Sequence, residues 1–200
     1  VNIVLVFGTN STWNQQKFDR IYTNKCTLLH EPHKKGKGSH RAVACNFGLQ
    51  NTHRPYVAFL DDDVSVPPTW AESALQYFKL AGDTPSDIIE PAGVTSGCTP
   101  YSSPFHRVQT IGSEAHSKTF KTITQVESIP GYNSIYLRKA LDIVQGFNEH
   151  IGGCEDWELN YRLRKAGWTL LGIPETPVEH RHNYTFSSYI KQKYGYGWRR

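Results

Sequence analysis

Short apolar runs with strand character alternate along this chain with longer segments of helical periodicity, and this alternation limits the folds that it can adopt. We expect strands at residues 1–7, 26–29, 56–60 and 87–89, and helices at 14–22, 39–49, 137–144, 155–166 and from Thr69 onward. Such an order is typical of an α/β fold with a mostly parallel central sheet flanked by helices. Trp70, Ala74 and Phe78 are expected to form the buried stripe of the helix that starts at Thr69. In the helix at 155–166, Leu159, Leu163 and Ala166 are expected to face inward, and Gly167 to end the helix. The 200 residues, without an internal repeat, predict one domain over 1–200 that includes an aromatic and basic segment at 183–200.

Three consecutive aspartates, Asp61, Asp62 and Asp63, directly follow the strand expected at 56–60. In open α/β sheets, ligands bind at the carboxyl ends of the strands. Adjacent carboxylates repel one another, and Mg²⁺ or Mn²⁺ would relieve that repulsion because these ions prefer carboxylate oxygens. Asp61 and Asp63 would point the same way from a strand-like backbone. Taken alone, the triplet fits a solvated turn before the next helix equally well.

Two glycines, Gly152 and Gly153, precede an acidic helix start at Glu155 and Asp156. Glycines allow the backbone to approach a ligand closely, which favours a site at this helix end. A carboxylate in a first helical turn is, however, more often a cap or a complement to the helix dipole.

A basic, glycine-containing loop at residues 33–41 leads into the helix expected at 39–49. Lys37 and Arg41, together with backbone N–H groups, could meet a phosphate there. The loop matches no established phosphate-binding fingerprint, and an ordinary basic loop is the simpler interpretation.

His180 and His182 lie two residues apart, so in a strand both would face one side and could bind a metal. Isolated histidines are more often surface or hydrogen-bonded residues.

Composition excludes several classes of protein. The hydrophobic fraction of 38% is too high for a disordered chain, and no apolar run approaches the roughly 18 residues that a membrane-spanning helix needs. The net charge of +4 comes from basic residues interleaved with acidic ones, which argues against nucleic-acid binding. Four scattered cysteines favour a reduced, cytoplasmic location, although glycosylation-type triplets at Asn10 and Asn183 leave a secretory compartment open.

Four segments of the sequence together resemble the family 2 glycosyltransferases, which have the GT-A fold. They are VNIVLVFGTNST, KGKGSHRAVACNFGL followed by YVAFLDDDVSVPPTW, GYNSIYLRKALDIVQGFNEHIGGCEDWELNYRLRKAGW, and VEH with a serine pair a few residues later. The third is the most specific, because it combines G-x-N, G-F-N-E, E-D and a helix ending in R-x-x-K-A-G-W. The resemblance extends from residue 1 to about residue 188.

The resemblance implies a role for each acidic feature. Asp61 and Asp63 take the D-x-D positions that hold Mn²⁺ or Mg²⁺ and the donor diphosphate, and Asp156 takes the position of the general base, with Glu155 beside it. His180 falls where some relatives place a further metal ligand, with His182 as a competing choice. The expected donor-binding residues are Lys37, Arg41, Asp61, Asp62 and Asp63.

The implied function is metal-dependent transfer of a hexose-like sugar, with inversion, from a nucleotide-diphosphate sugar to a hydroxyl group. Carbohydrate, lipid-linked and protein acceptors all remain open, and we expect the acceptor to lie under residues 95–125 and 194–198. The sequence also departs from the family pattern. We expect the family's usual first strand to be missing before residues 1–7, and the family's nucleobase-binding aspartate is replaced around residues 7–10. This loss favours, as an alternative, a non-catalytic module that binds sugars or nucleotide sugars. A nucleotidyltransferase would need a glycine-rich phosphate loop at the first strand.

Overall fold

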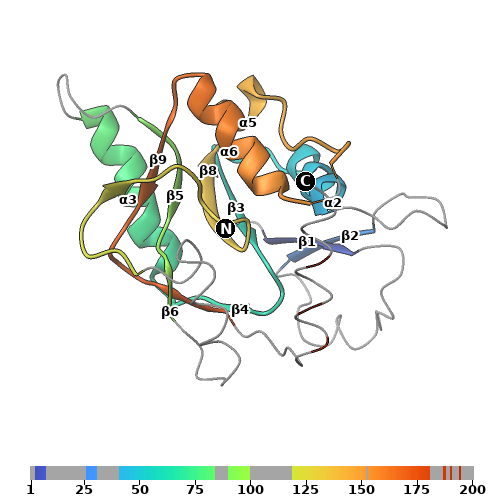
Figure 1. Ribbon diagram of the computed structural model, residues 1–200, viewed down its shortest axis with the longest axis horizontal. Coiled ribbons are helices and arrows are strands. Elements are labelled where there is room, and N and C mark those ends of the chain that lie inside the picture. The colour runs from blue at the N-terminus through green and yellow to red at the C-terminus, as the bar shows by residue number, and fades with distance from the viewer. Residues whose placement is uncertain are drawn as a thin grey trace.

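The computed structural model describes six stretches of the chain and three single residues, and Figure 1 shows how they are arranged. The stretches are residues 3–7, 26–30, 41–83, 90–99, 119–151 and 153–180, and the single residues are 187, 190 and 194. Within this part of the chain, no helix is both long and apolar enough to cross a bilayer. The helix predicted at 14–22 and the strand predicted at 87–89 lie outside the described residues.

A five-stranded sheet with the order β3-β8-β5-β9-β7 forms the centre of the fold. Its strands are β3 (Tyr56–Leu60), β5 (Pro91–Thr95), β7 (Thr124–Gln125), β8 (Asn133–Leu137) and β9 (Thr169–Gly172). β5 is parallel to β9, whereas β8 is antiparallel to both β3 and β5, and β7 is antiparallel to β9. The α/β class is confirmed, but the sheet is mixed rather than mostly parallel. β8 enters it in reverse, and antiparallel neighbours need no helical crossover.

Two smaller sheets complete the strands of the described residues. β1 (Ile3–Phe7) is parallel to β2 (Cys26–His30), which confirms the two strands predicted in this region. β4 (Val64–Ser65), β10 (Val178–His180) and β6 (Cys98–Thr99) form a three-stranded sheet in that order. In this sheet β10 is antiparallel to β4, so the strand that follows the aspartate triplet runs beside the strand that ends at His180.

In Figure 1, α3 lies at the left, α5 and α6 lie in the upper middle, and α2 lies to their right. Their bounds are α2 (Arg41–Gln50), α3 (Trp70–Asp83), α5 (Arg138–Ile143) and α6 (Glu155–Lys165), close to the predicted ones. The predicted apolar stripe of α3 is confirmed, since Trp70, Ala74 and Phe78 are buried.

The end of α6 departs from its prediction at one residue. Leu159 and Leu163 are fully buried as expected, and Gly167, with φ of 89°, follows the helix as predicted. Ala166 was expected to face inward by the same periodicity but is exposed. It is the C-cap residue, with φ −81° and ψ 6°, so the chain has already left the helix there and the helical period no longer applies.

Aromatic packing joins the two strands that position the site. The Phe59 ring lies 6.0 Å from the Tyr136 ring and 5.0 Å from the Phe147 ring, centroid to centroid. Both contacts are edge-on, the arrangement that aromatic quadrupoles favour. β3 and β8 are thus fixed against each other close to the carboxyl end of β3.

The side chain of Asn46 in α2 forms hydrogen bonds to the G-F-N-E turn at residues 146–149. Its amide donates to the Phe147 carbonyl and to Oε1 of Glu149, and its Oδ1 accepts the Phe147 N–H, each at 2.8 Å. Gly146 has a positive φ of 68°, and a Cβ there would lie 2.6 Å from Oδ1 of Asn46. Glycine at this position of the motif therefore permits both the backbone angles of the turn and the close approach of α2.

Asn46→Ala is expected to lower the free energy of unfolding by about 2–4 kcal/mol, because it leaves the backbone N–H and C=O of Phe147 without their partner. Urea denaturation measures this change. Asn51→Ala is the matched control, since the exposed Asn51 side chain donates to the Phe47 carbonyl one turn away, and the effect of its loss should stay within about 0.5 kcal/mol. Equal losses in the two variants would contradict the assignment.

Candidate active site

The aspartate triplet lies in the connection between β3 and β4. Asp61 directly follows the last residue of β3, and a turn in which the Val64 N–H donates to the Asp61 carbonyl at 3.3 Å leads into β4. Across the antiparallel β4–β10 pair, His180 is in register with Val64. This pairing brings His180 next to Asp63, although 117 positions separate them in the sequence.

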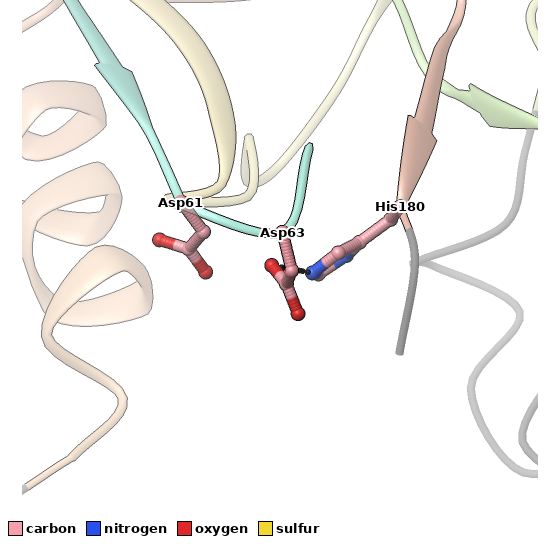
Figure 2. A group of neighbouring side chains, drawn as sticks. All are labelled: Asp61, Asp63 and His180. Carbon is pink, nitrogen blue, oxygen red and sulfur yellow. Dashed lines mark hydrogen bonds and ion pairs between the residues drawn. The ribbon is translucent and has the colours of Figure 1, made fainter. Parts of the chain in front are cut away.

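Asp61, Asp63 and His180 form a cluster in which one ligand atom from each residue lies within 4.8 Å of the others. Nε2 of His180 is 2.9 Å from Oδ1 of Asp63. Figure 2 shows both carboxylates on the same side of the chain, with the His180 ring directed at Asp63. The two carboxylates are 36% and 38% exposed, so an ion could reach them from solvent. Two carboxylates and one imidazole suit Mn²⁺, and Mg²⁺ if water and phosphate oxygens complete its shell.

The His180 ring is buried against Tyr132. The two ring centroids are 4.2 Å apart, with an angle of 39° between the planes. Burial raises the pKa of the Tyr132 hydroxyl well above its usual range, so this group stays protonated at neutral pH. Tyr132 therefore presents an uncharged ring that limits how the imidazole can turn.

Arg41, the first residue of α2, connects three acceptors around the site. Its Nη2 and Nε donate to Oδ1 of Asp61 at 2.8 and 3.2 Å, and its Nη1 donates to Oε1 of Glu155 at 3.1 Å. Nη2 also donates to the Gly131 carbonyl at 2.7 Å. Burial alone would lower the pKa of Arg41, but the surrounding acidic groups outweigh it and raise that pKa.

Asp156, in the first turn of α6, is held by backbone donors. Its Oδ2 accepts the Gly131 N–H at 3.1 Å, and its Oδ1 accepts the Trp157 N–H at 2.8 Å. The residue before the helix, Cys154, has left-handed backbone angles of φ 60° and ψ 28°, which are uncommon for a residue with a side chain. The helix thus begins with a sharp change of direction beside the site.

Several of the predicted site residues therefore come together. Asp61, Asp63 and His180 form one cluster, Arg41 joins Asp61 to Glu155, and Gly131 links that network to Asp156. Asp62 lies between the two clustered aspartates and is exposed. Lys37 and His182 lie outside the described residues, so their predicted roles stay predictions.

Sequence reasoning assigned no role to Gly131 or Tyr132, although both belong to a segment quoted for the family resemblance. Asn133, the third residue of that segment, is fully buried and bonds the Trp70 indole and the Gly97 carbonyl. The signal for these residues was the G-x-N motif itself, in which the glycine and the asparagine are the recognisable positions.

Cys45 lies one turn after Arg41 on α2 and near the acidic residues. Burial raises the pKa of its thiol to about 11, and nearby Glu155 acts in the same direction although Arg41 opposes it. The thiol is therefore neutral at physiological pH and is a poor nucleophile. Cys45, Cys98 and Cys154 all carry free thiols.

Solved structures of similar fold define the class. One is Staphylococcus aureus TarS, residues 1–349, in complex with UDP-GlcNAc (TM-score 0.62, 15% identity, 94% of this chain and 52% of that chain). A second is a mannosyltransferase from Pyrobaculum calidifontis in complex with GDP-Man and Mn²⁺ (TM-score 0.65, 17% identity, 96% of this chain and 51% of that chain). The fold is that of the GT-A glycosyltransferases, as predicted.

The sequence comparisons define the family within that class. The family model described as "Glycosyl transferase family 2" matches residues 8–144, and the chain belongs to this family. The Pre-mycofactocin glycosyltransferase of Mycobacterium tuberculosis is 31% identical over 175 residues, which cover 85% of this chain. The chain spans 35% of the length of that relative.

Proposed function

We propose that this chain transfers a sugar from a nucleotide-diphosphate sugar to a hydroxyl group of an acceptor, with a divalent ion at Asp61, Asp63 and His180. The observation that carries the proposal is the convergence of these three side chains within 4.8 Å of one another. Their chemistry fits Mn²⁺ or Mg²⁺, which bind carboxylate oxygens and often share their shells with substrate phosphates. When bound, the ion would neutralise charge on the departing diphosphate.

The donor in this proposal is supported by proteins of the same fold. The P. calidifontis mannosyltransferase was solved with GDP-Man and Mn²⁺, and TarS was solved with UDP-GlcNAc. Asp61 and Asp63 would face the diphosphate of such a donor. Lys37 and Asp62 would also contribute to donor binding.

Asp156 is the group that we assign as the general base. Its two backbone donors hold the carboxylate in a fixed orientation at the start of α6. It would take the proton of the acceptor hydroxyl as the oxygen attacks the anomeric carbon from the face opposite the leaving diphosphate. This single displacement inverts the configuration of the sugar. Glu155 is paired with Arg41, so Asp156 is better suited to act as the base.

Donor binding should depend on the metal, and a thermal-shift screen with UDP, GDP and dTDP sugars tests it. At a donor concentration of about 100 times Kd, mass action stabilises the folded state by about 2.7 kcal/mol, or roughly 5–10 °C in Tm for a chain of this size. We expect one donor series to produce this shift with Mn²⁺ and to lose it with EDTA. No shift for any donor at millimolar concentration in Mn²⁺, or an equal shift in EDTA, would contradict the proposal.

A further inference from the structure

Arg41 is the residue through which the metal-binding side of the site contacts the side that carries Asp156. The guanidinium bonds Asp61, Glu155 and the Gly131 carbonyl, which lie 20, 114 and 90 positions away in the sequence. The N–H of Gly131 donates in turn to Oδ2 of Asp156 at 3.1 Å. Asp61 and Asp156 are thus joined through one side chain and one backbone residue.

The bonding pattern of Arg41 favours this role over contact with a phosphate. All three of its nitrogens, Nε, Nη1 and Nη2, already donate to protein acceptors. A planar guanidinium holds several acceptors in a fixed geometry, which the point charge of a lysine cannot do. Both bonds to Asp61 go to Oδ1, so this pairing does not use Oδ2.

Gly131 provides the space for this arrangement. A Cβ at this position would lie 2.3 Å from Nη1 of Arg41 and 2.9 Å from both its Cζ and its Nη2, closer than real contacts allow. Any side chain at residue 131 would therefore push the guanidinium away from its acceptors. In this chain, glycine at position 131 leaves the space that the Arg41 guanidinium occupies.

We propose that Arg41 is a positioning residue that holds Asp61 and, through Gly131, Asp156 in the geometry that transfer needs. The inference rests on the function proposed above, and it replaces the phosphate contact first expected of Arg41. Arg41 does not touch the reacting atoms in this account. It fixes the distance between the carboxylate that binds the ion and the carboxylate that takes the proton.

The first test uses donor-free protein, so that it does not depend on turnover. Amide hydrogen exchange is measured for peptides covering residues 127–137 and 153–160 in wild type, Arg41→Lys and Gly131→Ala, with Arg164→Gln as an exposed control on α6. Loss of the Arg41 contacts should speed exchange in both peptides by about tenfold in Arg41→Lys and Gly131→Ala, and leave the control unchanged. Exchange within about twofold of wild type in Arg41→Lys would overturn the proposal.

The second test separates positioning from phosphate binding in the active protein. A positioning role predicts that kcat falls about tenfold or more in both variants while the donor KM changes less than about threefold. A donor KM raised more than about threefold in Gly131→Ala at unchanged kcat, with Arg41→Lys close to wild type, would instead identify a phosphate contact and overturn the inference. If wild type itself shows no turnover, the function proposed above fails, whereas the exchange experiment still decides the role of Arg41.

Discussion

Asp156→Asn is expected to lower turnover by about a hundredfold or more, with donor affinity and stability nearly unchanged. Asparagine keeps the size of the side chain and can still accept the N–H of Gly131 or Trp157 through its carbonyl oxygen. It also caps helices about as well as aspartate. What it loses is the ability to take a proton from the acceptor hydroxyl. Steady-state kinetics with a matched donor and acceptor measure the loss of turnover and the donor KM, and thermal denaturation measures the stability.

Asp142→Asn is the matched control for that variant. Asp142 lies on α5, is exposed, and its carboxylate forms a long ion pair of 3.9 Å with Arg138, so the same chemical change there should leave kcat within about twofold. If Asp156→Asn also stays within a few-fold of wild type, Asp156 acts only as a helix cap. The mechanism would then need another base or a different stereochemical course.

Asp63→Ala should lower donor affinity in Mn²⁺ to the value that wild type shows in EDTA. The reason is that Asp63 supplies a carboxylate to the cluster and is the group beside Nε2 of His180, so its loss removes one ligand and releases a second. Isothermal titration with the nucleoside diphosphate, with and without Mn²⁺, measures this change.

His180→Gln tests the third ligand separately, because glutamine fills much of the space beside Tyr132 that alanine would leave empty. We expect a loss of about tenfold or more in Mn²⁺ affinity. His53→Ala, at an exposed position, serves as the control and should bind Mn²⁺ like wild type. Unchanged Mn²⁺ affinity in His180→Gln would remove His180 from the proposed ligands.

Local patterns were sufficient to predict most of the elements around the site. The apolar run Tyr56–Leu60 predicted β3, and the spacing of Trp70, Ala74 and Phe78 predicted the buried face of α3. The position of Asp61 and Asp63 after a buried strand also predicted that they could share an ion. These features depend on residues close in the sequence, where periodicity and burial are directly linked.

Features that depend on distant pairing could not be predicted in the same way. The reversed direction of β8 and the contact of Arg41 with Glu155, 114 positions away, leave no periodic signal. Local sequence alone did not distinguish His180 from other histidines. Its proposed role came from the family resemblance, and its register with Val64 supports that proposal. Helical periodicity predicted that Ala166 is buried, but α6 ends at Lys165, one residue before it.

The most direct test of the central claim is the release of nucleoside diphosphate and the formation of glycosylated product, measured together for the donor that stabilises the protein. With Mn²⁺ and an acceptor, we expect one diphosphate released for each sugar transferred, with inverted anomeric configuration in the product and no reaction in EDTA. A donor that binds but is never consumed with any acceptor would identify a non-catalytic binding module. Equal rates of transfer with and without the ion would contradict the metal site at Asp61, Asp63 and His180.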